Sequence, residues 1–195
     1  MYIIGIMKKL ILASNNKGKI AEIKNILGDR FEVVSLKECG IEIDVEETGT
    51  TFEENAFIKA KAIFDIAGLP VISDDSGLVV NALNGEPGVY SARYAGEQHC
   101  DADNNAKLLR NLEGVIDRSA AFVCCAVYYD GVSKIVATGK VEGEILFKAE
   151  GESGFGYDPL FYSKELCKSF GVATFEEKNS VSHRARAFKE LATNL

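Results

Sequence analysis

The sequence predicts an α/β fold, in which an elongated central mixed β-sheet is flanked by helices and a cleft separates two lobes. Three observations favour this architecture. Residues 8–27 show a strand–loop–helix order, with an apolar run, a polar loop and then apolar residues at helical spacing. Residues 51–72 show a long amphipathic helical pattern that leads into a β-branched run. Residues 120–141 contain two β-rich runs joined by Asp130-Gly131, a strong hairpin signal.

The first unit comprises a strand at residues 8–13, a polar loop at 14–19 and a helix at about 19–27. This order aims backbone N–H groups and a helix N-terminus at an anion, and Lys19 adds a positive charge at the same place. A simple helix cap explains the polar loop equally well. The apolar positions of this helix are Ile20, Ile23, Ile26 and Leu27.

A second strand is expected at residues 31–36, and a dense acidic loop follows at 42–49. That loop is either a solvated, self-repelling surface or the source of a second carboxylate for a metal ion. The helix at 51–67 is strongly marked by a capping box at its start and by a glycine at its end. Asn55 and Lys59 lie one turn apart on it, where they either line a cleft or face solvent.

Adjacent carboxylates, Asp74 and Asp75, follow the apolar run at residues 70–72, which predicts a buried strand, and they open an expected turn at 74–78. Such a turn places charge at the carboxyl edge of a sheet, where open α/β sheets bind ligands. Neighbouring side chains of an extended chain point to opposite faces, so one carboxylate faces the cleft and the other supports the turn. A carboxylate in a cleft can hold Mg²⁺ or accept a proton from water. A solvated turn is the alternative.

The middle of the chain predicts shorter elements. Residues 78–83 form a short strand or helical piece, and the loop at 85–96 carries two tyrosines and an arginine that we expect to contact a ligand or a partner chain. A helix is expected at 101–112 and a further strand at 143–147. The residues of that helix expected to face inward are Ala106, Leu108, Leu109 and Leu112.

The glycine-rich loop at residues 151–161 could stack an aromatic side chain on a planar base, or could be a hairpin loop anchored by its aromatics. The last helix opens at residues 182–184. His183 and Arg184, with Lys178 nearby, make a corner rich in hydrogen-bond donors. A lone histidine at a helix start has a structural role more often than a catalytic one.

Length and composition indicate one domain covering residues 1–195, with 1–7 as an N-terminal extension and Met7 as an alternative start. A hydrophobic content of 47% supports a sizeable core, and the net charge of −7 argues against a nucleic-acid polymer as partner. The apolar start is too short to span a membrane, so we expect a cytoplasmic protein. Five cysteines without paired spacing predict free thiols, with the adjacent Cys124 and Cys125 pointing apart.

Seven short motifs follow one another along the chain. They are Ser14-x-Asn16-x-x-Lys19, Glu46-Glu47-Thr48-Gly49, Thr51-Phe52-x-Glu54-Asn55-Ala56, Asp74-Asp75-Ser76-Gly77-Leu78, Pro87-Gly88-Val89-Tyr90-Ser91-Ala92-Arg93-Tyr94, Gly154-Phe155-Gly156-Tyr157-Asp158-Pro159, and Glu177-Lys178 with Ser182-His183-Arg184. Taken together and in this order, they resemble the inosine/xanthosine triphosphate pyrophosphatase family over nearly the whole chain from Lys8 onward. Relatives often have Thr and Gly where this chain has Ser14 and Asn15.

The resemblance implies a role for each matching residue. Glu46 and Asp75 would hold Mg²⁺, Asp75 would also be the catalytic base, and Ser76 would contact the substrate. The triphosphate would be bound by Ser14, Asn15, Asn16, Lys17, Gly18 and Lys19. The purine would be held by Phe155, Gly156, Tyr157, Asp158, Lys178, His183 and Arg184.

The resemblance also implies an activity and an assembly. The enzyme would be a homodimer with an ITPase-like fold and would hydrolyse ITP, dITP and XTP to the monophosphate and pyrophosphate, keeping deaminated purines out of DNA and RNA. Two alternatives are a related pyrophosphatase for other modified nucleotides and a nucleotide sensor that does not hydrolyse its ligand.

Overall fold

The computed structural model describes residues 7–96 and 100–195, so most of the expected N-terminal extension lies outside the described residues. A seven-stranded mixed sheet runs in the order β2-β1-β3-β4-β5-β6-β7. The strands are β1 (Lys8–Leu12), β2 (Phe31–Ser35), β3 (Val71–Val80), β4 (Ser119–Tyr129), β5 (Lys134–Ile145), β6 (Phe161–Ser163) and β7 (Lys168–Ser169). The α-helices are α1 (Lys17–Leu27), α2 (Phe52–Ala67), α3 (Asp101–Asn111), α4 (Phe175–Val181) and α5 (His183–Thr193). Short 3₁₀ helices are η1 (Lys37–Cys39), η2 (Asn81–Leu83), η3 (Gly88–Arg93) and η4 (Asp158–Leu160).

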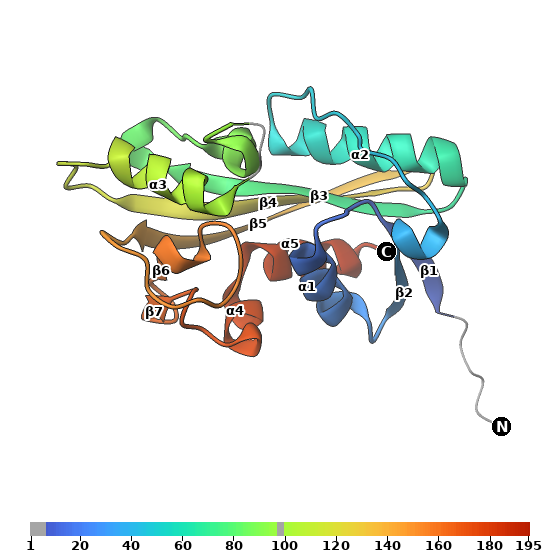
Figure 1. Cartoon of the computed structure of the whole chain (residues 1–195). Helices are drawn as coiled ribbons and strands as arrows, with labels where there is room; N and C mark the ends of the chain where they lie inside the picture. The colour runs from blue at the N-terminus through green and yellow to red at the C-terminus, as the bar shows by residue number, and fades with distance from the viewer. Residues whose placement is uncertain (1–6, 97–99) are drawn as a thin grey trace.

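Helices cover both faces of the elongated sheet, as Figure 1 shows. The helices α2 and α3 lie on one face, with α2 packed on β3 and β4. The helices α1, α4 and α5 lie on the other face, with α5 packed on β4 and β5 and α1 packed on α5. The predicted α/β class, with a mixed sheet flanked by helices, is confirmed.

One edge of β3 is only partly paired, which leaves a gap in the sheet beside the C-terminal part of this strand. On one side β3 pairs antiparallel with β4 along its whole length. On the other side β1 pairs parallel with β3 at only two positions, Ile11 with Val71 and Leu12 with Ile72. The chain turns away from the sheet after Ala13, so from Ser73 onward β3 has an edge that β1 does not cover. Polar side chains on both faces of β3 can therefore reach a common space.

The prediction of a turn at residues 74–78 is wrong, because β3 runs without interruption through these residues. Ser73 pairs with Val127, and Leu78 pairs with Phe122, so the whole stretch belongs to the β3–β4 ladder. Aspartate, serine and glycine favour turns when they are solvated. Here a long antiparallel partner supplies the backbone hydrogen bonds and buried polar neighbours hold the carboxylates, so tertiary structure overrides the local preference.

Other expectations are confirmed or corrected in detail. The capping box of Thr51 begins α2, and Asp130 and Gly131 lie in the loop of the β4–β5 hairpin. The separate strand expected at 143–147 is wrong, because β5 continues to Ile145 opposite β4. The helix at 101–112 is confirmed as α3, but Ala106 is exposed instead of facing inward. The strands β6 and β7 and the helix α4 are not among the elements expected from the sequence.

Three hydrophobic clusters surround the open part of β3. One joins α1 and α5 to the sheet through Ile23 and Phe188, and a second joins α2 to the opposite face through Ile63. The third gathers Phe122, Phe161 and the residues beneath α3. Cys124 belongs to the first cluster and Cys125 to the second, so these free thiols point apart as expected. Within residues 7–96 and 100–195, no helix has the length and apolar character that a membrane crossing requires.

Candidate active site

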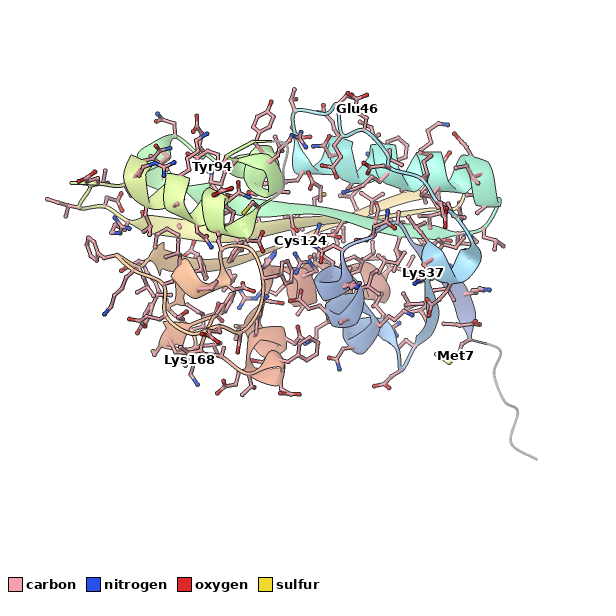
Figure 2. The ribbon with its side chains drawn as sticks, in the orientation of Figure 1. Met7, Lys37, Glu46, Tyr94, Cys124 and Lys168 are labelled. Atoms are coloured by element: carbon pink, nitrogen blue, oxygen red, sulfur yellow. The ribbon has the colours of Figure 1, made fainter. Side chains whose placement is uncertain are left out.

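A cavity of about 640 Å³ lies along the open edge of β3 and is lined by segments far apart in the sequence. Figure 2 shows Glu46, one of its lining residues, on the loop that precedes α2. Other lining groups come from the loop before α1, from β3, and from the starts of α3 and α5. The cavity brings together fourteen of the sixteen predicted site residues, namely Ser14, Asn15, Asn16, Lys19, Glu46, Asp75, Ser76, Phe155, Gly156, Tyr157, Asp158, Lys178, His183 and Arg184.

Asp74 and Asp75 lie on opposite faces of β3, as strand alternation predicts. Asp74 faces α1 and α5, where its Oδ2 accepts a hydrogen bond from Lys19 Nζ at 3.0 Å and lies 3.5 Å from Arg184 Nε. Burial alone would raise the pKa of Asp74, but Lys19 and Arg184 outweigh it and hold the pKa well below its usual value. Asp74 is therefore a permanent carboxylate that organises two cations.

Asp75 faces α2 and meets a different environment. Its Oδ2 accepts a hydrogen bond from Asn55 Nδ2 at 3.2 Å, and its Oδ1 accepts one from the Ser76 N–H at 2.9 Å. Burial raises the pKa of Asp75, which Lys59 and Lys19 only partly offset. A carboxylate with a raised pKa beside a cavity is a better proton acceptor than an ordinary aspartate, so Asp75 has the properties of a general base.

Lys59 and Glu47 form an ion pair next to Asp75. Burial acts to lower the pKa of Lys59, but the charges of Asp75, Glu47 and Asp74 outweigh burial and raise it. Lys59 therefore stays charged and neutralises part of the acidic patch. Asn55 lies one turn earlier on the same side of α2 and donates to Asp75, so both α2 side chains face β3 beside the cavity.

The loop before α1 combines a helix cap with a cationic side chain. Asn16 is the N-cap, and its Oδ1 accepts a hydrogen bond from the Lys19 N–H at 3.1 Å. Ser14 Oγ in turn accepts from the Asn16 N–H. Lys17 and Gly18, which were predicted to bind the triphosphate, do not line the cavity: Lys17 is exposed and Gly18 lies against the ring of Phe155.

The predicted corner of Lys178, His183 and Arg184 exists, and all three residues are buried. Lys178 Nζ donates to Asp158 Oδ2 at 2.6 Å and lies 2.8 Å from Glu22 Oε1. Arg184 pairs with the same Glu22, and its Nη2 donates to Ser76 Oγ at 2.9 Å. A buried acid on α1 thus holds both cations in place.

His183 is held differently from its two neighbours. Its ring stacks on Phe122 at a centroid distance of 4.9 Å. Burial, and then the charges of Arg184 and Lys178, lower the pKa of His183 well below its usual value, so the imidazole is neutral. In the part of the chain that the structure describes, the buried His183 Nδ1 has no hydrogen-bond partner. A buried nitrogen without a partner beside a cavity can hydrogen-bond a ligand.

The glycine-rich loop presents an aromatic side chain to this corner. The ring of Phe155 lies 4.6 Å from Lys178 Nζ and 5.5 Å from the Arg184 guanidinium carbon. Asp158 Oδ2 accepts from the Phe155 N–H at 2.8 Å, and Tyr157 donates its hydroxyl hydrogen to the Ser91 carbonyl at 2.9 Å. The loop is therefore held by a hydrogen bond within itself and by one to η3.

The carboxylates that line the cavity are suited to a hard cation. Glu46 and Asp75 both line it, as does Glu47, although no three acids, histidines or cysteines of residues 7–96 and 100–195 form a preassembled cluster. Mg²⁺ needs only one or two carboxylates, because waters and substrate phosphates complete its coordination. The donor set therefore fits Mg²⁺ bound together with a phosphorylated substrate.

From the sequence, Lys59 either lines a cleft or faces solvent, and no individual role is expected for Glu22 or Glu47. All three contact residues from other segments of the chain, so local patterns give only weak signals for them. Along the extended segment 42–49, neighbouring side chains point to opposite sides, so alternation predicts that only one of Glu46 and Glu47 faces the protein. In the structure that residue is Glu47, which is half-buried, whereas Glu46 is exposed. Helical spacing would have placed Glu22 on the same side of α1 as Lys19.

One cavity thus combines four features: cationic side chains, a helix N-terminus, an acidic patch and an aromatic corner. This combination is typical of an enzyme that acts on a phosphorylated small molecule containing a ring. The chain belongs to the Ham1 family, whose sequence profile matches residues 10–194. This confirms the resemblance found in the sequence.

Relatives and solved structures agree over almost the full length. A dITP/XTP pyrophosphatase of Clostridium perfringens is 52% identical over 199 residues, with 97% of this chain and 98% of the relative covered. The Staphylococcus aureus Ham1 protein superposes with a TM-score of 0.86 at 46% identity, covering 96% of this chain and 97% of that one. A Ham1 protein from Coxiella burnetii gives a TM-score of 0.87 at 40% identity, covering 96% and 98%.

Proposed function

We propose that this chain hydrolyses the non-standard purine nucleoside triphosphates ITP, dITP and XTP between the α- and β-phosphates, giving a nucleoside monophosphate and pyrophosphate. The observation that carries the proposal is the convergence of Lys19, Asp75 and Arg184 on one cavity. The relatives named dITP/XTP pyrophosphatase support the choice of substrate.

Each part of the cavity matches one part of such a substrate. Lys19 and the N-terminus of α1 would bind the phosphate tail and stabilise the departing pyrophosphate. Asp75 would accept a proton from the attacking water, and Lys59 would limit repulsion between the acidic patch and the phosphates. Glu46 and Asp75 would hold Mg²⁺, which when bound supplies charge neutralisation and orients the phosphates.

Base selection would follow from hydrogen-bond matching in the corner of Lys178, His183 and Arg184. A 6-oxo purine presents an acceptor where adenine presents a donor, so donors in the corner would pair with the first and be left unpaired by the second. Sites built on such a pairing reject the wrong substrate strongly. The ring of Phe155 would stack on the purine.

A pyrophosphate-release assay over the common and deaminated nucleoside triphosphates tests the proposal. ITP, dITP and XTP should be hydrolysed with kcat/KM roughly ten-thousandfold above ATP, which is the scale on which a site that hydrogen-bonds its substrate rejects an analogue without the matching group. A preference for pyrimidine or methylated nucleotides would favour the related pyrophosphatase instead. Tight binding without pyrophosphate release would favour a sensor.

Removal of divalent cations should abolish turnover. With EDTA in excess, ITP hydrolysis should fall by at least about a thousandfold, because the carboxylates of the cavity would then repel the triphosphate and the cationic side chains alone would face the charge developing on it. Added Mg²⁺ should restore the rate. Activity that survives exhaustive chelation would contradict the metal part of the proposal.

His183 offers a test of base selection that keeps the packing of the site. His183→Phe preserves a ring against Phe122 but removes both nitrogens, so the ratio of kcat/KM for ITP over ATP should fall about tenfold, the value of one hydrogen bond of about 1.4 kcal/mol. His183→Asn keeps a polar atom close to the Nδ1 position and should retain more of the ratio. An unchanged ratio in both variants would remove His183 from base selection.

We also propose that the whole chain forms one domain and that two copies form a homodimer, as the family resemblance implies. Light scattering coupled to size-exclusion chromatography tests this directly. A particle of twice the chain mass at micromolar concentration is expected, and a particle of one chain mass would contradict the dimer.

A further inference from the structure

The backbone of Gly156 is held from both sides by two side chains of α3. Its N–H donates a hydrogen bond to Asp101 Oδ2 at 2.7 Å. Its carbonyl accepts one from Asn105 Nδ2 at 3.0 Å. Asp101 and Asn105 lie four residues apart, so both point from one side of the helix. The two bonds together fix the orientation of both peptide groups that flank Gly156.

Gly156 adopts a backbone conformation that needs such support. Its φ of +63° lies in the left-handed region, which glycine enters without steric cost. Apart from its two chain neighbours, no described residue has an atom within 4 Å of the position that a Cβ would occupy, so the conformation and not a lack of space accounts for the glycine. A free glycine populates many conformations, and the two α3 side chains select one of them.

The presence of an asparagine at position 105 is not explained by a contribution to the stability of α3. Its Nδ2 is used by the Gly156 carbonyl, while its Oδ1 is buried and has no partner among the described residues. A buried acceptor without a partner destabilises the folded state. The amide is therefore accounted for by the contact it makes with the loop.

The held peptide lies next to the aromatic side chain of the site. Phe155 precedes Gly156, and its ring rests near Lys178 and Arg184. Within the loop, the Phe155 N–H donates to Asp158 Oδ2, the Tyr157 hydroxyl donates to the Ser91 carbonyl, and the Phe155 carbonyl accepts a hydrogen bond from the Asp158 N–H at 3.2 Å. The peptide group between Phe155 and Gly156 is therefore held at its carbonyl by the loop itself, and the bond to Asp101 holds its N–H side against α3.

We infer that Asp101 and Asn105 are positioning residues for the purine-binding loop: they fix the Gly156 backbone and so set the direction in which the ring of Phe155 meets a planar base. This inference rests on the proposed function for its consequence in catalysis, but the contact itself can be measured without substrate. Asp101 and Asn105 act through the loop and not on the reacting atoms.

Amide hydrogen exchange, followed by mass spectrometry on the full chain without ligand, tests the contact. Peptides that cover residues 153–158 should exchange at least about fivefold faster in Asp101→Ala and Asn105→Ala than in the parent, because each variant frees the Gly156 peptide. Asp101→Asn keeps an acceptor oxygen and should recover most of the protection. Peptides from α5 serve as an internal reference and should not change.

Asp103→Ala is the matched control. Asp103 lies in the same first turn of α3 and is exposed, so the variant removes the same charge from the same helix end but leaves the loop contact in place. It should exchange like the parent. If the peptides covering residues 153–158 exchange at the same rate in Asp101→Ala as in Asp103→Ala, or at the same rate in Asp101→Ala as in the parent, the inference is wrong.

Kinetics then connect the contact to substrate. Asp101→Ala and Asn105→Ala should raise KM for ITP about tenfold with kcat within about twofold, as expected when a binding loop is loosened and the chemical step is untouched. A raised KM without a change in exchange would mean that Asp101 touches the substrate directly, and this would overturn the positioning role. If the parent hydrolyses no nucleotide, the proposed function fails while the exchange result still decides the inference.

Discussion

Replacing Asp75 by Asn is expected to lower kcat for ITP by at least about a thousandfold. A lost general base costs about a hundredfold to ten-thousandfold in rate, and the loss should be greater if the variant also fails to bind the metal. The expectation follows from the environment of this side chain. Burial raises the pKa of Asp75, and the side chain lies on the cavity face of β3. Asn has the same shape and keeps an acceptor for the Asn55 amide, so the variant should fold normally. Pyrophosphate release measures turnover, and thermal unfolding checks the fold.

Asp44→Asn provides the control for charge. Asp44 also lines the cavity, but it is exposed on the acidic loop, so this variant changes the net charge by the same amount without removing the proposed base. Its kcat should stay within about threefold of the parent, since exposed charges are screened by solvent. Near-normal turnover of Asp75→Asn would show that another group accepts the proton.

The roles of Asp74 and Asp75 show what the sequence alone could establish. Alternation along an extended chain correctly separated the two carboxylates onto opposite faces. The expectation of a turn was wrong, because the preference of Asp and Ser for turns assumes solvent as the competing partner. In the structure β4 supplies the backbone partners, and Lys19 and Asn55 supply the side-chain partners.

Residues of the site that act through distant partners could not be found in this way. Most of the cavity-lining residues belong to the short motifs and could be predicted from them, because each motif is a short stretch of the sequence. Glu22 is different: it lies in the middle of an amphipathic helix, where an acid normally faces solvent. Glu22 is buried only because α4 and α5 pack beside α1, and no pattern within residues 17–27 predicts that packing.

The second large effect expected is on stability. Glu22→Gln should lower the free energy of unfolding at pH 7 by about 3 to 5 kcal/mol, the usual cost of removing one partner from a buried ion pair. Glu22 is 2% exposed, and its carboxylate pairs with both Lys178 and Arg184. Gln keeps the size of the side chain but leaves two buried cations with less opposing charge. For a chain of this length, the melting temperature should fall by roughly 10 °C.

Glu144→Gln is the matched control on the surface. Glu144 pairs with Lys164 at 3.2 Å, but its side chain is about half exposed, so solvent screens the pair and stability should change little. The comparison separates the effect of burial from the effect of losing one negative charge. Equal losses of stability in the two variants would contradict the argument.

The pH dependence gives a sharper test of the same assignment. Burial acts to raise the pKa of Glu22, but Arg184 and Lys178 outweigh it, so the folded-state pKa lies below the ordinary value of 4.5. A carboxyl group of this kind stabilises the fold above the unfolded-state pKa, and this contribution is lost as the pH falls through the folded-state value. The gap in unfolding free energy between the parent and Glu22→Gln should therefore be full at pH 7 and shrink below pH 4.5. Denaturant unfolding at several pH values measures it, and a gap that does not vary with pH would mean that lost packing, and not lost charge, explains the instability.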